Sequence, residues 1–467
     1  MGDNDLHLIA HLMRRAGFGA RRDELEAYAA KGYDAVVDDL LNTQSRDDVD
    51  QDILDRYYAS STEGGDEAIS QGHWVYRMVN GDGPLLEKMA LFWHHVFATG
   101  SEKVGHPPAS KRHLQMFRRV GLTDLRNILI ELSKDPAMIM WLDNNQNFGD
   151  APNENFGREL LELFSMGVGN YTEEDVKAAA QAFTGWTFTW SLRQSGARDA
   201  FPTYFDFVEP DHDRATKTFL GETGPFNGED VIDVIVRQPA TARFISRHLY
   251  TFFVADEPPV ASWNETLPQD QEAIDILVKA YLESHADVRH VLGALFRSDF
   301  FKQAMFKRVK SPVELVTGMA KLIGPEPLPD FDSSPHANAA GEMGQSLGNP
   351  LTVEGWHTGR EWIDGGTLST RVEYATEQVA DVTKPGIRAI VDRLAANDVV
   401  SPTDFVDRCV ELVGPVPVGA DTRQGLLTYA ESEGDLSFGS DADRERNEAR
   451  VVRMLQLIVS AREFQFN

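Results

Sequence analysis

Apolar residues recur at three- and four-residue spacings in one segment after another of this 467-residue chain, which is the pattern of amphipathic helices. A representative segment, GPLLEKMALFWHHVFATG, places four apolar side chains on one helical face: Leu85, Met89, Phe92 and Val96. Strand-like alternation of bulky and polar residues is rare, and its clearest examples are WTFTWSL and AFPTYFDFVEP. The sequence therefore predicts a mainly α protein, a multi-helix bundle-like body with a minor β-hairpin or small sheet around residues 186–208.

The length of the chain bears on its division into domains. At about 150 residues per domain, the chain corresponds to about three domain-sized units, which helical proteins can fuse into one body. We expect a main helical body over residues 1–325, which holds the polar residues considered below. A C-terminal helical region over residues 326–467 would pack on it, and a single continuous domain is the alternative.

Charge and cysteine content exclude several classes of function. The chain carries 73 acidic and 45 basic residues, a net charge of −28, so it lacks the basic surface that nucleic-acid binding requires. Its single cysteine, Cys409, rules out an intrachain disulfide and a thiolate metal cluster. No run of 18 apolar residues is present, and Arg14-Arg15 is followed by charged sequence rather than by the apolar stretch of an export signal. We therefore expect a cytoplasmic protein that binds neither nucleic acid nor membranes.

Acidic residues interrupt an apolar run in the segment NENFGRELLELFSMGVGNYTEEDV, residues 153–176. Glu159 lies three residues after Phe156 and four before Leu163, on the apolar stripe of the predicted helix, and Glu162 lies about one turn further on. A carboxylate among apolar residues must be paired, hydrogen-bonded, protonated or bound to a metal, because burial of a bare charge is very costly. Glu159 is therefore a candidate catalytic base or metal ligand, and an internal ion pair or a helix cap is the alternative.

Two histidines are further candidates. His94, in FWHHVF, lies at the edge of an aromatic stripe and could be a proton relay or metal ligand, or an ordinary core histidine. Together with Glu159 and Glu162, His94 completes a set of candidate ligands for a divalent metal between helices. His212, in PDHDRATKTFLG, has an aspartate on each side and could be a catalytic base or a ligand, or part of a polar turn.

Two other stretches could shape a binding pocket. MWLDNNQNFGDAPNENF is dense in amides, and Asp143 and Asn144 could form a pocket floor that binds substrate, or could satisfy backbone groups in a turn. In GNPLTVEGWHTGREWIDGG, Trp356 and Trp362 could wall a pocket, or could pack in a loop under the helices. The chain has no GxxxxGK[ST], GxSxG or HExxH motif, which argues against a P-loop nucleotide site, a standard serine hydrolase and a zincin.

Together these stretches are similar to one bacterial family, the domain-of-unknown-function family numbered 1800. The similarity spans nearly the whole chain and is carried by HLMRRAGFGA, FWHHVFAT, LDNNQN, APNENFGRELLELFSMGVGNYTEEDV, AFTGWTF, HDRATKTFLG, RQPATARFISRHLYTFFV, KSPVELV, GWHTGREWI and AREFQF. The resemblance implies a mainly helical protein and carries no established activity. It also implies a companion partner, because members often occur beside genes for a second family with a sulfatase- or phosphatase-like look. Many members carry export signals.

The chain departs from the family at two potential metal ligands. Many relatives have a histidine where this chain has Val96, and some have one where it has Phe164. Both positions are apolar here, which weakens a metal site built from several histidines. The polar positions that match the family are Glu159, Glu162, Asn155 and His94.

Two functional hypotheses follow. In the first, the protein is an enzyme with a buried Glu/His/Asn centre that catalyses hydrolysis or metal-assisted redox chemistry. The roles would fall to Glu159 as base or ligand, His94 as proton relay, and Asn155 and Arg158 as substrate-orienting groups. A divalent metal is compatible with this centre, and the sequence leaves the cofactor otherwise unknown. In the second, the protein is a non-catalytic accessory or binding protein, and a groove near Trp356 and Trp362 holds the companion family's product.

Overall fold

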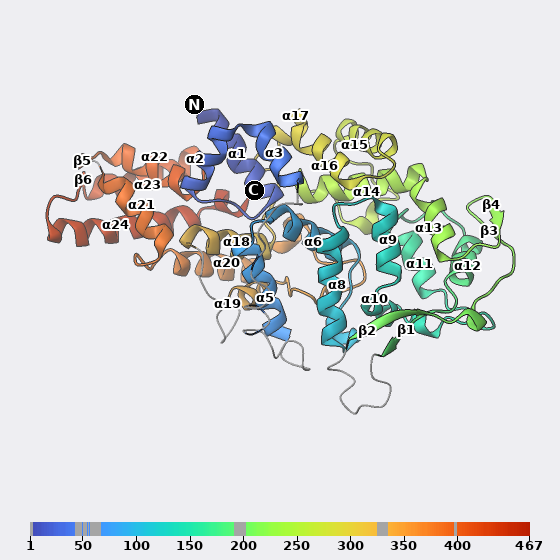
Figure 1. The fold of residues 1–467 in the computed structure, drawn as a ribbon. Coiled ribbons are helices and arrows are strands. Elements are labelled where there is room, and N and C mark those ends of the chain that lie inside the picture. The colour runs from blue at the N-terminus through green and yellow to red at the C-terminus, as the bar shows by residue number, and fades with distance from the viewer. Residues whose placement is uncertain are drawn as a thin grey trace.

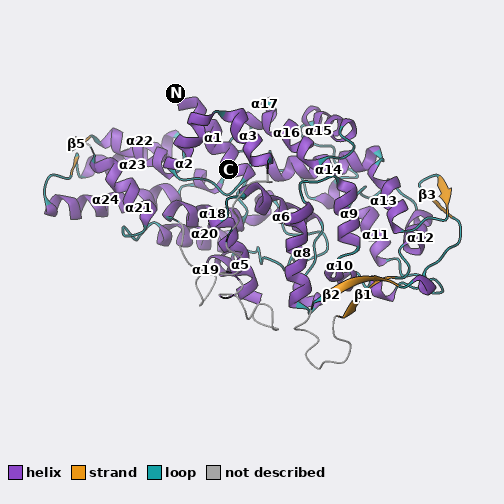
Figure 2. Cartoon of the chain, viewed as in Figure 1, coloured by secondary structure: helices purple, strands orange, loops and turns teal. Residues whose placement is uncertain are grey.

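The computed structural model describes residues 3–42, 49, 54, 56, 67–190, 202–324, 335–396 and 399–467. Over these ranges the protein is mainly helical, as predicted, and its strands form three short two-stranded sheets (Figures 1 and 2). The body is elongated. The last helices of the chain gather at one end (orange and red in Figure 1), and helices from the middle of the chain form the other end (cyan and green).

The first part of the chain supplies much of the centre of the body, where α6 is surrounded by protein. Its buried side chains lie on every face of the helix, and they include the charged residues Glu87 and Lys88. Pro84 occupies the first turn of α6, where a helix loses nothing from the missing N–H of proline. The helices of this part are α1 (Asp3–Ala16), α2 (Arg22–Lys31), α3 (Tyr33–Leu41), α5 (Glu67–Asn80), α6 (Pro84–Val96), α7 (Ser101–Val104), α8 (Pro107–Val120), α9 (Leu125–Ser133) and α10 (Pro136–Trp141).

The middle of the chain continues as helices whose starts are well capped. Thr172 and Asp175 form a reciprocal capping box at the start of α12, and Ser311 and Glu314 form another at the start of α18. Aspartates cap α15 and α16. The helices are α11 (Asn155–Glu162), α12 (Glu173–Ala182), α13 (Gly228–Val236), α14 (Pro239–Phe253), α15 (Gln271–Glu283), α16 (Val288–Arg297), α17 (Asp299–Lys302) and α18 (Pro312–Ile323).

The small sheet predicted around residues 186–208 is present. Strand β1 (Trp186–Trp190) pairs antiparallel with β2 (Thr203–Phe207), so that Trp186 lies opposite Phe207. Residues 191–201 between them lie outside the described part of the chain. The other two sheets are also antiparallel pairs: β3 (Lys217–Phe219) with β4 (Glu222–Gly224), and β5 (Val399–Val400) with β6 (Leu436–Ser437).

The C-terminal helices pack on the rest of the body through shared apolar contacts. Helices α19 and α20 both contact α18, and α19 also contacts α5. One hydrophobic core includes residues from Leu6 to Phe464. The predicted division at residues 325 and 326 falls within a segment outside the described residues, so it stays a prediction. The helices are α19 (Pro335–Glu342), α20 (Gly365–Gln378), α21 (Pro385–Ala395), α22 (Pro402–Val413), α23 (Ala420–Ser432) and α24 (Asp441–Ser460).

None of the described helices combines the length and the apolar character that crossing a membrane requires.

Candidate functional site

Glu159 lies on α11, half-buried beside two other carboxylates. The helix turns Phe156 and Leu160 into the core, and Glu159 lies at the margin of that apolar face. Burial raises the pKa of Glu159, and the charge of Glu162 raises it further. The charge of Arg158 lowers it in part, and that of Glu354 adds a smaller increase. The carboxyl group therefore lies in an acidic environment at the edge of the core. Its predicted catalytic role stays a prediction.

Arg158 and Asn155 face outward from the same helix. The Arg158 guanidinium donates to both carboxylate oxygens of Glu173, at 2.9 and 2.7 Å, and to Glu154 at 3.2 Å. These ion pairs tie α11 to the start of α12 and raise the pKa of Arg158. Asn155 is exposed, and its main-chain N–H donates to Asn153 Oδ1 at 3.0 Å. No contact among the described residues joins either side chain to His94.

The amide cluster before α11 is used to organise the backbone. Asn144 Nδ2 donates to the carbonyl of Trp186 at 2.9 Å, and Asn147 Nδ2 donates to the carbonyl of Ala180 at 2.8 Å. Asn147 Oδ1 in turn accepts from the N–H of Asn153 at 2.9 Å. These bonds fix the loop against the end of α12 and the start of β1. They match the alternative interpretation, in which the amides satisfy backbone groups.

Asp143 and His212 also have local partners. Asp143 has φ of 57° and accepts from Lys103 Nζ at 3.1 Å, at the surface. His212 is half-buried, and its Nδ1–H donates to the carbonyl of Thr184 at 3.0 Å. That bond holds the loop before β3 against the end of α12. The structure therefore places Asp143 and His212 near α11 and α12, each in a contact that orders a loop.

Trp356 and Trp362 are both buried, on the loop between α19 and α20. Trp356 Nε1 donates to the carbonyl of Ser346 at 3.1 Å, and its main-chain N–H donates to His95 Nδ1 at 3.3 Å. Gly355 has φ of +98°, and a Cβ at this position would overlap the main-chain oxygen of His95. The two tryptophans line a small cavity of about 40 Å³ that His95 shares.

His94, another sequence candidate, lies at a large cavity. Its ring is fully buried, and its centroid lies 5.8 Å from that of Trp74, 5.2 Å from that of Trp356 and 5.7 Å from that of His113. Neither ring nitrogen of His94 has a hydrogen-bond partner. Burial holds the pKa of His94 well below its usual value, and the charges of His113 and His95 act in the same direction, so the imidazole is neutral near pH 7.

The cavity beside His94 has a volume of about 410 Å³. Helices α5 and α8 contribute most of its wall, α6 contributes His94, and the loop before residue 349 closes one side. We call it the histidine cavity, because four histidines lie in its wall: His73, His94, His106 and His113. Its volume falls within the range of small-molecule sites, about 300–1,000 Å³.

His113 faces this cavity and is oriented by a buried carboxylate. Its Nδ1–H donates to Asp135 Oδ1 at 3.0 Å, and both side chains are buried. The same oxygen accepts from the N–H groups of Ala137 and Met138, at 3.0 and 3.2 Å, as the cap of α10. Because Nδ1 carries the proton, Nε2 of His113 is left as an acceptor, and it has no hydrogen-bond partner. An imidazole held in this way by a carboxylate can act as a general base.

Sequence reasoning did not single out His113 or Asp135. A signal was available, since His113 lies three residues before Met116 and four before Phe117, on the apolar stripe of α8. Asp135 precedes Pro136 and reads as an ordinary helix cap. The contact between them joins residues 22 apart and follows only from the packing of α8 against α10.

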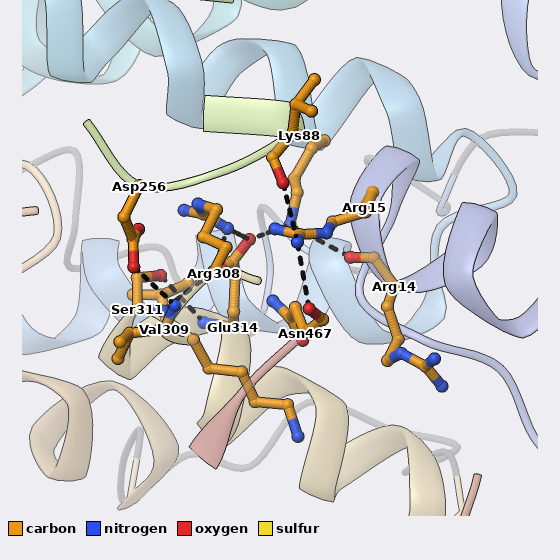
Figure 3. Close-up of polar contacts among 12 residues, drawn as sticks. Arg14, Arg15, Lys88, Asp256, Arg308, Val309, Ser311, Glu314 and Asn467 are labelled. Atoms are coloured by element: carbon orange, nitrogen blue, oxygen red, sulfur yellow. Dashed lines mark hydrogen bonds and ion pairs between the residues drawn. The ribbon is translucent and has the colours of Figure 1, made fainter. Parts of the chain in front are cut away.

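A second polar cluster, centred on Glu314, was also missed (Figure 3). Glu314 accepts from Lys88 Nζ at 2.6 Å and from Arg308 Nη1 at 2.7 and 2.8 Å, and all three side chains are buried. It also accepts from the N–H of Ser311 at 2.9 Å. Lys88 and Arg308 hold the pKa of Glu314 well below its usual value, although burial alone would raise it. The sequence hint was a lysine inside the apolar run of α6.

Among the described residues, no three His, Cys, Asp or Glu side chains come close enough together to hold a metal ion. The predicted trio of Glu159, Glu162 and His94 therefore does not form a common site. The two glutamates lie with Glu354, and His94 lies with His113 and Trp356.

Comparison with known proteins gives one match. The family model described as "Protein of unknown function (DUF1800)" matches residues 11–466, nearly the whole chain. Neither a curated protein nor a solved structure matches the chain. The agreement with the sequence resemblance extends to every stretch quoted above from HLMRRAGFGA to AREFQF.

Proposed function

We propose that this chain, which belongs to the DUF1800 family of proteins of unknown function, is an enzyme that hydrolyses a small substrate in the histidine cavity. The observation that carries the proposal is the Asp135–His113 pair, with His113 Nε2 free to accept a proton at the wall of a cavity of about 410 Å³. Buried polar atoms nearly always have partners, and exceptions concentrate at functional sites. Both ring nitrogens of His94 and Nε2 of His113 are buried without a hydrogen-bond partner, so their burial is unfavourable unless a bound molecule pairs with them.

The chemistry assigns a distinct step to each imidazole. His113 Nε2 takes a proton from a water molecule, whose oxygen then forms a bond to the carbonyl carbon of the substrate. Asp135 stabilises the imidazolium that results. Neutral His94 has one N–H, and it donates a hydrogen bond to the oxyanion that develops on the carbonyl oxygen. When the tetrahedral intermediate collapses, the protonated His113 returns its proton to the leaving group.

The rest of the wall limits the substrate to a small molecule with an apolar part. Trp74, Leu114 and Leu347 supply apolar surface. Hydroxyl and amide side chains supply a few polar contacts, which is the usual composition of small-molecule pockets. The polar residues in the wall that could fix the substrate's orientation include Ser70, Gln71, Thr99, Ser110 and Gln115.

The proposal is tested by turnover of a panel of chromogenic carboxylic esters and amides. In His113→Gln we expect kcat/KM to fall by about 10²–10⁴, the range typical of a lost general base. Asp135→Asn keeps an oxygen to cap α10 but removes the negative charge, so it separates catalysis from folding. Exposed His290→Gln is the matched control. If His113→Gln turns over every substrate at the wild-type rate, the centre lies elsewhere.

A second candidate function, binding of a partner, is supported by a different cavity. A hollow of about 510 Å³ beside Glu162 is lined by Phe244, Trp263 and Leu267, and the Leu267 side chain is 82% exposed. Exposed apolar side chains at a hollow are typical of binding surfaces. In this reading the companion family's product would occupy it. Leu267→Ser would then weaken that association, measured by calorimetry, and would leave ester turnover unchanged.

A further inference from the structure

The Glu314 cluster contains more positive than negative charge. Around Glu314 and Asp256, six cationic side chains interact electrostatically with one another and with the two carboxylates: Arg14, Arg15, Lys88, Arg308, Lys310 and Arg371. A free carboxylate at Asn467 would still leave the cations in excess. Burial without enough counter-charge is unfavourable for each of them.

The carboxylate of Glu314 is fully occupied by part of this set. Its oxygens accept from Lys88, from Arg308 and from the N–H of Ser311. Within the described residues, Arg14 and Lys310 form no ion pair. Their hydrogen bonds go to main-chain carbonyls, from Arg14 Nη1 to Gly414 at 3.1 Å and from Lys310 Nζ to Phe464 at 2.6 Å.

Several donors of the cluster remain unused. Arg14 Nε, Arg15 Nε and Nη1, and Asn467 Nδ2 are buried atoms without a hydrogen-bond partner. Figure 3 shows the Arg14 side chain extending away from Glu314, and Asn467 lies beside Arg15. Arg15 reaches the carbonyl of Asn467 with its other terminal nitrogen, at 3.0 Å. A guanidinium has five donors and no acceptor, so only an acceptor or an anion can satisfy these groups.

Of these residues, Arg14 and Asn467 line a cavity of about 60 Å³ between α1, α18 and the segment that ends at Asn467. Its wall holds Arg14, Lys310, Lys321 and Asn467, together with Glu314. Arg14 and Lys321 are half-buried, so solvent reaches this part of the cluster. One water molecule needs about 10–15 Å³ of such cavity volume, so the cavity has room for one small ion.

We propose that this cavity binds a small oxyanion, a phosphate or a carboxylate, between Arg14, Lys310 and Lys321. The anion would accept from the unused donors of Arg14 and Asn467 and would offset the excess positive charge of the cluster. Lys310 and Lys321 would act as point charges, whereas the Arg14 guanidinium would supply a directed bond. The site is separate from the histidine cavity, so it stands or falls independently of the proposed hydrolysis.

The test is isothermal titration of the full chain with sodium phosphate, and in parallel with sodium acetate, at an ionic strength held constant with sodium chloride. We expect saturable binding of one equivalent of at least one anion. Phosphate alone, or acetate alone, identifies which oxyanion chemistry the site takes. Absence of saturable heat with both anions up to 10 mM, about a hundredfold above a dissociation constant of ~0.1 mM, overturns the proposal.

Variants locate the binding. Arg14→Gln and Lys321→Gln should each weaken binding at least tenfold, and the second variant keeps the test decisive if the first does not fold. Lys307→Gln removes an equal charge from an exposed position three residues before Lys310 and should bind as the wild type does. Equal affinity in all of these proteins would mean non-specific attraction and would also overturn the proposal.

Discussion

Replacing Glu314 by glutamine should lower the free energy of unfolding far more than the same replacement at the surface does. Glutamine keeps the size of the side chain and one oxygen for the N–H of Ser311, but it removes the charge that Lys88 and Arg308 share. The side chains of Lys88 and Glu314 are 0% and 2% exposed. Removing one partner of a buried pair costs about 3–5 kcal/mol, because the other charge is left buried and uncompensated. We expect a loss of at least this size.

The chain contains a matched control for this experiment. Glu26 also binds two cations, Arg22 at 2.8 Å and Arg393 at 2.9 and 3.0 Å, but on the surface. Exposed pairs contribute about 0.2–1 kcal/mol each, so Glu26→Gln should cost a small fraction of what Glu314→Gln costs. The two variants differ mainly in burial, and the comparison therefore isolates desolvation from charge pairing.

Urea unfolding, followed by far-ultraviolet circular dichroism and by tryptophan fluorescence, measures both losses. A fall in the midpoint at unchanged slope reports stability alone. In Lys88→Met with Glu314→Gln, the uncompensated lysine is gone, so the double variant should be more stable than Glu314→Gln. If Glu314→Gln loses less than about 1 kcal/mol, or if the double variant is the least stable, the argument from buried charge is refuted.

Two further predictions concern single titrating groups. The folded-state pKa of His94 lies below its unfolded value near 6.5, so its contribution to stability is complete above pH 6.5 and is lost as the pH falls. Below pH 6, the unfolding free energy of the wild type should drop by up to about 1.4 kcal/mol more per pH unit than that of His94→Leu; parallel curves would contradict this. Burial and Glu162 raise the pKa of Glu159, so its charge weakens the fold as the pH rises above about 4.3. Glu159→Gln should therefore melt about 1–2 °C higher at pH 7 and no higher at pH 4, whereas a lower melting temperature at pH 7 would reveal a stabilising partner.

Local patterns predicted the fold because helices and hairpins depend mainly on residues that are close together in sequence. The stripe through Leu85, Met89 and Phe92 gave α6, and the alternation near residue 186 gave β1 and β2. The same stripe could not reveal that α6 is surrounded on every side, because its outer faces are covered by segments far away in sequence. Lys88, for example, meets Glu314 across 226 residues.

Local sequence patterns revealed the candidate site only in part, because its residues also come from segments far apart in sequence. His94 stood out because it interrupts an aromatic stripe. Its neighbours in the cavity, His113 and Trp356, come from different helices and loops, and nothing near His94 names them. Glu159 stood out because it lies on an apolar stripe, which is also a local pattern. Its carboxylate neighbours are Glu162 and Glu354, and Glu354 is far away in sequence. Asn144 lies in an amide-rich stretch that suggested a binding pocket, but its side-chain amide donates to the main-chain carbonyl of Trp186.

The distance in sequence between Lys88 and Glu314 sets a condition on synthesis. Ribosomes add about 5–20 residues per second, so the 226 residues between them take about 10–45 s to appear. For that time the helix that becomes the centre of the body carries an ammonium group with no counter-charge, and closing α6 into a dry interior would be unfavourable. The nascent chain must keep this face hydrated until translation passes residue 314, so the centre of the molecule is among the last parts to close.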